Sequence, residues 1–199
     1  MVAGNGQSLP DLLRDIRACR ICEEHLPLGP RPVVVAEKSA RILIIGQAPG
    51  TAVHASGVPW DDPSGDRLRD WMSLGKEAFY DPARIAIMPM GFCYPGRLPK
   101  GGDAPPRPEC APHWHDRLRA QLPQIELTLL VGSYAQNHYL HDDRSRNMTQ
   151  TIRNWRDLGP GLLPTPHPSW RSGIWLKKNP WFEAELLPVL RERVGKLVG

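Results

Sequence analysis

Residues 41–65 read RILIIGQAPGTAVHASGVPWDDPSG, and this stretch decides the fold that the sequence predicts. It opens with the apolar run 42–45, whose lack of alternation predicts a strand buried on both faces of a sheet. A Gly/Pro turn ends the run, and a polar loop leads to a helix that is expected to begin near Asp66. A buried strand, a loop and a helix in this order are typical of parallel α/β sheets, which bind ligands at the carboxyl edge.

Three more apolar runs resemble the first, and amphipathic segments separate them. We expect these strands at 85–90, 127–131 and 162–165, and helices at 9–18, 65–72, 108–122, 134–140, 148–155 and 180–194. Ser133 is placed to cap its helix and Pro188 to bend the last one. The alternation predicts an α/β fold, a three-layer α/β/α sandwich around a four-stranded parallel sheet, in a single domain over residues 1–199.

Composition sets few limits on function. The 199 residues are 41% hydrophobic and carry a net charge of +4, which permits a polyanionic partner such as DNA without requiring one. No apolar run reaches the length of a membrane span, and residues 1–15 lack the pattern of a signal peptide, so we expect a cytoplasmic protein with no membrane contact.

The chain has four cysteines, and their spacing points to metal binding. Cys19 and Cys22 form a CxxC pair after the first expected helix, while Cys93 and Cys110 stand near the two ends of a Pro/Gly-rich loop. Thiolates are the usual ligands of iron–sulfur clusters and of structural zinc, and four of them complete either site. Buried thiols without a metal are the alternative, because cysteine is among the most buried residue types.

Two polar loops follow expected strands and would meet at the carboxyl edge of the sheet. The first contains Gln47, Ala48, Pro49 and Gly50, and the second begins with His167 between two prolines. A neutral imidazole held in this way can donate to a carbonyl oxygen or stabilise an anion; a histidine that satisfies a backbone carbonyl is the alternative. The first loop lacks the GK[ST] sequence of a phosphate-binding P-loop.

Aromatic and charged residues accompany both loops. Trp60 can stack on a base or line the core, and Asp61 and Asp62 can cap the next helix or orient a water molecule. Residues 170–178 mix tryptophans with basic residues on an expected loop, as in nucleic-acid surfaces or in an ordinary solvated loop.

Together these motifs resemble the uracil-DNA glycosylase superfamily, and most closely its iron–sulfur branch, family 4, of which this chain would be an atypical member. That branch has GE[GA]PG, then G-x-P-F and A-G; here the chain has GQAPG, then Gly57, Val58-Pro59-Trp60 and Ser64-Gly65. The second motif, HPS, is matched at residues 167–169, and the four cysteines fall in the branch's order. The resemblance covers about residues 10–195.

The resemblance implies a monomeric, monofunctional enzyme that flips deoxyuridine out of single- or double-stranded DNA and hydrolyses its N-glycosidic bond, leaving free uracil and an abasic site. His167 would stabilise the departing uracil anion, and Trp60 would stack on the base. Residues 47–50 would line the base pocket. Ser169, Trp170 and Arg171 would contact DNA, with Arg171 entering the duplex. The cysteines would hold a structural 4Fe–4S cluster, with zinc or no metal as alternatives.

The chain departs from the branch at two positions. Gln47 stands where the branch has the glutamate of the first motif, and it is a catalytic candidate because of this position. The role of that glutamate as the base is not carried over to a glutamine, so the base must come from His54, Asp61 or Asp62. Pro89 stands where the branch has an asparagine that reads the uracil edge, which leaves Asn137 or a backbone group for that contact. The alternatives are a protein that binds abasic or damaged DNA with little activity, and a glycosylase for another deaminated base such as hypoxanthine.

Overall fold

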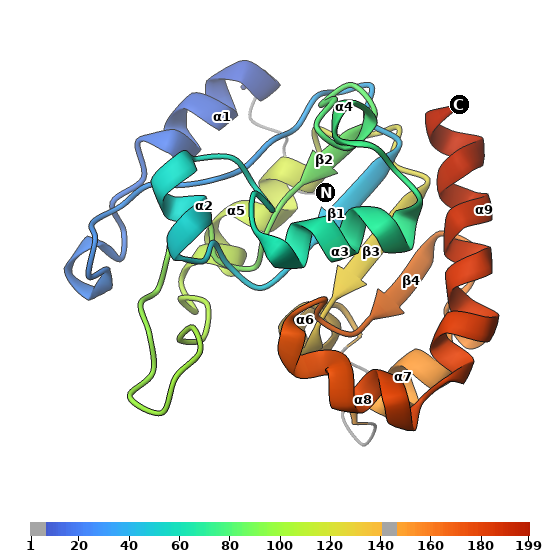
Figure 1. Cartoon of the computed structure of the whole chain (residues 1–199). Helices are drawn as coiled ribbons and strands as arrows, with labels where there is room; N and C mark the ends of the chain where they lie inside the picture. The colour runs from blue at the N-terminus through green and yellow to red at the C-terminus, as the bar shows by residue number, and fades with distance from the viewer. Residues whose placement is uncertain (1–6, 141–146) are drawn as a thin grey trace.

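The computed structural model describes residues 7–140 and 147–199, and it contains one parallel sheet (Figure 1). Its strands are β1 (Ile42–Ile45), β2 (Ile85–Ile87), β3 (Leu127–Val131) and β4 (Leu162–Thr165). They lie in the order β2-β1-β3-β4, and each neighbouring pair is parallel. The predicted α/β fold around a four-stranded parallel sheet is therefore confirmed.

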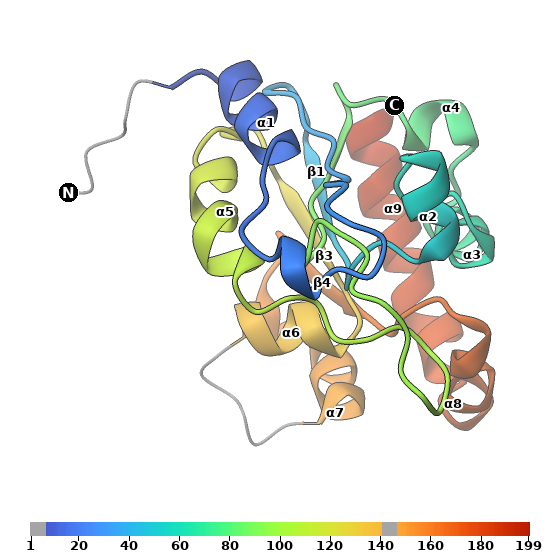
Figure 2. The same ribbon diagram turned by 90° about the vertical axis from the view of Figure 1, so that its left-hand side faces the viewer.

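Helices cover both faces of the sheet (Figure 2). On one face α3 (Pro63–Met72) and α9 (Leu187–Val198) pack on Ile42 and Ile44 of β1, and on the other α1 (Leu9–Arg17) and α5 (Cys110–Arg119) pack on Leu43 and Ile45. Because successive side chains of a strand point to opposite faces, the apolar run of β1 fills both layers of the core. The shorter helices are α2 (Thr51–Ser56), α4 (Lys76–Phe79), α6 (Ser133–Tyr139), α7 (Met148–Arg153) and α8 (Gly173–Lys178).

The second strand is shorter than the predicted 85–90 because of Pro89. The amides of Met88 and Met90 still donate to Ile44 O and Gly46 O at 2.9 Å, but the proline between them has no N–H to pair. The strand therefore ends at Ile87, and Pro89 lies buried at the carboxyl edge of the sheet.

Other segments also depart from the prediction. The polar loop after Gly50 contains α2, and residues 170–178 form the 3₁₀ turn Trp170–Ser172 and α8 instead of a loop. Gly132, not Ser133, occupies the N-cap of α6, which has no side-chain capping bond. The expected helix 180–194 is a π-helical turn, Phe182–Leu186, followed by α9, and Pro188, which has no N–H to donate, stands in the first turn of α9 directly after the π-helical turn.

Two further 3₁₀ turns, Glu23–His25 and Trp155–Leu158, complete the described elements. Across the described ranges, none of the helices combines the length and the apolar character that crossing a membrane requires.

Candidate active site

A cleft of about 430 Å³ opens at the carboxyl edge of the sheet, between the loops that follow β1 and β4. Its volume lies within the range of pockets that take a small ligand or a nucleotide base. The structure brings most of the sequence-predicted site residues together in its lining: Gln47, Ala48, Pro49, Gly50, Trp60, Asp62, Pro89, His167, Ser169, Trp170 and Arg171.

Trp60 stands on one wall of this cleft with an unusual backbone. Its φ is +58°, a left-handed conformation that bulky residues rarely adopt, and its ring lies 5.6 Å from the His167 ring. Gly46 makes room for the indole, because a Cβ at that position would lie 2.7 Å from the Trp60 ring. A strained residue at the wall of a cleft is typical of a functional site.

The backbone of Trp60 is held by a buried arginine. Arg69 is 5% exposed, and its guanidinium donates to the Trp60 carbonyl at 3.3 Å and to the Tyr80 hydroxyl at 2.9 Å. The Tyr80 hydroxyl also donates to that carbonyl, at 3.2 Å, and Asp66 pairs with the guanidinium at 2.5 Å. The charge is therefore compensated, and the network fixes the orientation of the tryptophan.

His167 faces Trp60 from the loop after β4. Its backbone carbonyl accepts a hydrogen bond from the Ser172 hydroxyl at 2.5 Å, which fixes the turn. Gly132, next to this loop, has a φ of +85°, which favours glycine, and a Cβ there would lie in ordinary contact with the His167 Cβ at 3.4 Å. Burial lowers the pKa of His167, and the Asp62 carboxylate only partly opposes the shift. The imidazole is therefore neutral at neutral pH and can donate a hydrogen bond without carrying a charge.

The three candidates for the base occupy different places. Asp62 lines the cleft, and its Oδ1 caps α3 by accepting from the Gly65 amide at 2.8 Å. Asp61 is exposed and lies outside the lining. His54 on α2 also lies outside the lining, with its ring 6.0 Å from that of Tyr94 and its Nδ1 buried without a partner among the described residues.

The cleft also contains residues that sequence reasoning missed. Arg97, Gly102 and Asp103 reach it from the long loop after β2, where Arg97 and Asp103 pair in an antiparallel bridge. The glycine pair before Asp103 is a hairpin-turn signal that could have indicated this bridge. The distance in sequence between these residues and both motifs concealed their place in the site.

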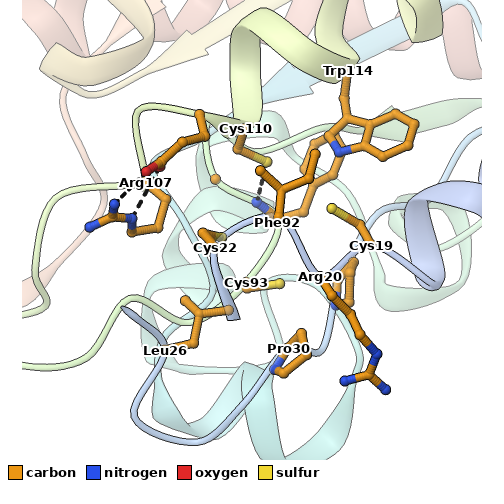
Figure 3. Close-up of a pocket in the computed structure, with 14 residues that line it drawn as sticks. Cys19, Arg20, Cys22, Leu26, Pro30, Phe92, Cys93, Arg107, Cys110 and Trp114 are labelled. Carbon is orange, nitrogen blue, oxygen red and sulfur yellow. Dashed lines mark hydrogen bonds and ion pairs between the residues drawn. The ribbon is translucent and has the colours of Figure 1, made fainter. Parts of the chain in front are cut away.

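A second cavity shares no lining residue with the cleft, and all four cysteines line it. In Figure 3 the sulfurs of Cys19, Cys22, Cys93 and Cys110 surround its interior. Burial raises the pKa of Cys93 to about 11 and that of Cys110 to about 12, and it raises the pKa of Cys22 as well. As free thiols these groups are therefore protonated at neutral pH.

Within residues 7–140 and 147–199, no cluster of three or more His, Cys, Asp or Glu side chains is arranged to hold a metal ion. The chemistry of four thiols around one cavity fits either an iron–sulfur cluster or a structural zinc ion, because thiolates are the usual ligands of both.

The fold and the cleft define a class of protein: an α/β protein with a base-sized cleft that is lined by a tryptophan and a neutral histidine. A family model described as the uracil DNA glycosylase superfamily matches residues 32–191. The chain belongs to the uracil DNA glycosylase superfamily, and it is accordingly a DNA glycosylase, a hydrolase of N-glycosidic bonds whose substrate is DNA. The match begins after Cys19 and Cys22 and so does not include the CxxC pair.

Proposed function

We propose that the protein removes uracil from DNA: it flips deoxyuridine out of the strand and hydrolyses its N-glycosidic bond, releasing uracil and leaving an abasic site. The observation that carries this proposal is the placement of a neutral His167 opposite Trp60 in one cleft. A flipped base fits such a site, because it can stack on the indole while the imidazole reaches its edge.

The chemistry follows from the charge that develops as the bond breaks. Uracil departs as an anion, and a hydrogen bond from the His167 N–H to its O2 stabilises that anion in the transition state. A neutral donor suits this role, since burial disfavours a charged imidazole and the neutral ring still offers an N–H to the anion. The backbone around Gln47 and Ala48, which also lines the cleft, would hold the other edge of the base.

The rim of the cleft provides the DNA contacts. Trp170 is 78% exposed, and the Arg171 guanidinium lies 5.4 Å from its ring centroid. Arg67 donates to the Ser169 carbonyl at 2.8 Å and so fixes the turn from which both side chains project. We expect Ser169 and nearby backbone to contact phosphates, with Trp170 and Arg171 at the position that the flipped nucleotide leaves.

The four cysteines would hold a structural 4Fe–4S cluster. Such a group would supply no chemistry to the hydrolysis, and its contribution would be to fix the loop between Cys93 and Cys110. Iron and sulfide analysis with visible absorbance of protein purified without oxygen tests this. A colourless protein containing zinc, or no metal, would exclude the cluster.

The activity is tested with single- and double-stranded oligonucleotides that contain one uracil, followed by alkaline cleavage of abasic sites. We expect strand scission with wild-type protein and none with a matched thymine oligonucleotide. Absence of scission at stoichiometric protein would exclude uracil removal. Tight binding retained in that case would instead favour a protein that recognises abasic or damaged DNA.

One observation favours a second substrate. Pro89 lines the cleft, but it has no N–H, and its carbonyl already accepts a hydrogen bond from His115 Nε2 at 3.1 Å. Pro89 therefore offers no polar group that could select uracil, and another deaminated base would lose no hydrogen bond at this position. Scission of a hypoxanthine oligonucleotide but not of the uracil one would establish this alternative.

A further inference from the structure

A short hairpin spans the cleft and belongs to neither motif. Residues 96–104 fold back on themselves through hydrogen bonds from Leu98 N to Gly102 O at 2.9 Å and from Ala104 N to Gly96 O at 2.8 Å. At its base Gln47 Nε2 donates to the Ala104 carbonyl at 3.2 Å. At its tip Gly102 lies against the Arg171 guanidinium. The hairpin is thus fixed to the first motif at one end and meets the second at the other.

The hairpin places a carboxylate in the cleft. Asp103 is solvent-accessible, lines the cleft, and has its Oδ2 so near the first motif that a Cβ on Gly50 would lie 3.5 Å from it. The charged groups around it are Arg97 and Arg171, which favour its ionised form, and Asp62, which disfavours it. Burial of part of the side chain outweighs the arginines, and the pKa of Asp103 is raised above its ordinary value.

The reaction requires a group of this kind, and the first motif does not provide one. Gln47 and Ala48 cannot accept a proton, while His54 and Asp61 lie outside the cleft. Asp62 lies inside, but one of its oxygens is committed to the amide of Gly65. Asp103 is the remaining carboxylate in the lining, and an acid with a raised pKa is a stronger base once ionised.

We propose that Asp103 is the catalytic carboxylate of this glycosylase and activates the attacking water; the assignment rests on the proposed function. The bond between C1′ and the base nitrogen breaks, and its electron pair leaves with the base, which His167 stabilises. The water oxygen then bonds to C1′, and its proton passes to the Asp103 carboxylate and from there to solvent. The same negative charge stabilises the cationic sugar before water attacks.

Single-turnover cleavage by Asp103→Asn tests the assignment directly. The substitution keeps the shape and removes the base, so we expect cleavage to slow by about 100-fold with DNA affinity within about threefold of wild type. The wild-type rate should rise with pH as the carboxyl ionises, and this rise should be missing in the variant. Asp70→Asn, an exposed site on α3, is the matched control. A rate within threefold of wild type, or a larger loss in Asp62→Asn, would overturn the assignment.

A binding measurement tests the assignment of Asp103 independently of cleavage. If the wild-type protein cleaves none of the deaminated bases, that result refutes the proposed function and leaves the assignment of Asp103 to the binding measurement. Oligonucleotides carrying a cationic pyrrolidine or a neutral tetrahydrofuran at the abasic position differ in charge where Asp103 is expected to face the sugar. We expect wild-type protein to prefer the cation by about tenfold, and Asp103→Asn to lose that preference. An equal preference in both proteins would overturn the assignment.

Discussion

The cleft and the cysteine cavity differ in volume, openness and polarity. The cleft at the sheet edge is open and lined by charged side chains, among them Asp62, Arg97 and Arg171. The cysteine cavity is smaller and less open, its accessible surface is largely apolar, and burial raises the pKa values of the Cys93 and Cys110 thiols that line it. An open, charged surface suits binding of a polyanion and proton transfer, whereas a small apolar cavity suits a structural role.

One segment nevertheless serves both cavities. The chain leaves the cysteine cavity at Cys93, forms the hairpin that carries Asp103 into the cleft, and returns at Cys110. At the return the Phe92 amide donates to the Cys110 sulfur at 3.3 Å, which joins the two ends of the loop. The cysteine cavity therefore fixes both ends of a loop whose middle, the hairpin with Asp103, is proposed to act on the substrate.

Replacing His167 should produce the largest effect on turnover. His167→Ala removes the donor to the departing anion, and we expect single-turnover cleavage to fall about 10²–10³-fold, which corresponds to about 3–4 kcal/mol. DNA affinity should stay within a few-fold, because the proposed contact of the imidazole is with the base and not with the phosphates. Gel-based cleavage and fluorescence anisotropy measure the two quantities on one substrate.

His113→Ala, an exposed position on α5, is the control for this variant. Equal losses in cleavage and in binding for His167→Ala would contradict a catalytic role of the cleft, because the cleft would then act only as a binding surface.

Stability between pH 6.5 and 4 should depend on His115, which connects α5 to the cleft. His115 is 1% exposed; its Nε2 donates to the Pro89 carbonyl at 3.1 Å, and its Nδ1 lies 2.6 Å from the Tyr139 hydroxyl. Burial lowers its pKa to about 4, so between about pH 4 and 6.5 the unfolded state binds a proton that the folded state does not. The contribution of His115 to the free energy of unfolding is fully present above pH 6.5. It is lost as the pH falls towards 4, and the loss is about 3 kcal/mol at most.

Urea unfolding of wild type and His115→Gln across this range measures the effect. The difference in unfolding free energy between the two proteins should shrink as the pH falls. A difference that does not change with pH would show that the imidazole is not held neutral. His138 and Arg119, which lower its pKa further, and Asp116, which raises it, are the other charged groups beside it.

Gly65→Ala should damage the Trp60 wall of the cleft. An added Cβ would overlap the Trp60 carbonyl and lie 2.9 Å from the Trp60 Cβ, and neither group can move without displacing the indole. We expect a loss of about 1–3 kcal/mol in unfolding free energy together with slower cleavage. Thermal unfolding and single-turnover assays on the same preparation test both parts.

Gly195→Ala is the matched control, because a Cβ at that helical position of α9 meets nothing within 4 Å. Alanine there should stabilise the protein by about 0.5–1 kcal/mol. If Gly65→Ala loses stability but cleaves at the wild-type rate, Trp60 does not shape the catalytic part of the cleft.

The sequence predicted the elements that depend on local pattern. The apolar runs located all four strands, and the motif residues Gln47 and His167 were correctly expected at one sheet edge because parallel strands end together. The helix α2 was missed because only Val53 among its residues is buried, which leaves no apolar period to recognise. Asp103 was missed because its place depends on a hairpin fixed by partners far away in sequence, Gln47 and Arg171.

Among these substitutions, Arg171→Ala should have the smallest effect. It should weaken DNA binding more than it slows turnover. The guanidinium stands at the rim, exposed beside Trp170 and against Gly102 of the hairpin, where it can reach a phosphate or the vacated stack. We expect DNA affinity to fall about tenfold, close to 1.4 kcal/mol, and the dependence of log affinity on log salt to decrease by about one. Anisotropy titrations at several salt concentrations measure both.

Lys38→Ala, an exposed cation outside the cleft lining, provides the baseline for that titration. An unchanged salt slope with weaker binding would assign Arg171 to stacking in the duplex and not to a phosphate. Loss of turnover without loss of affinity would mean that Arg171 acts through the hairpin, by holding Gly102 and with it Asp103 in place. The hairpin would then be fixed by both regions of the molecule, by the cysteine cavity at its ends and by the rim of the cleft at its tip.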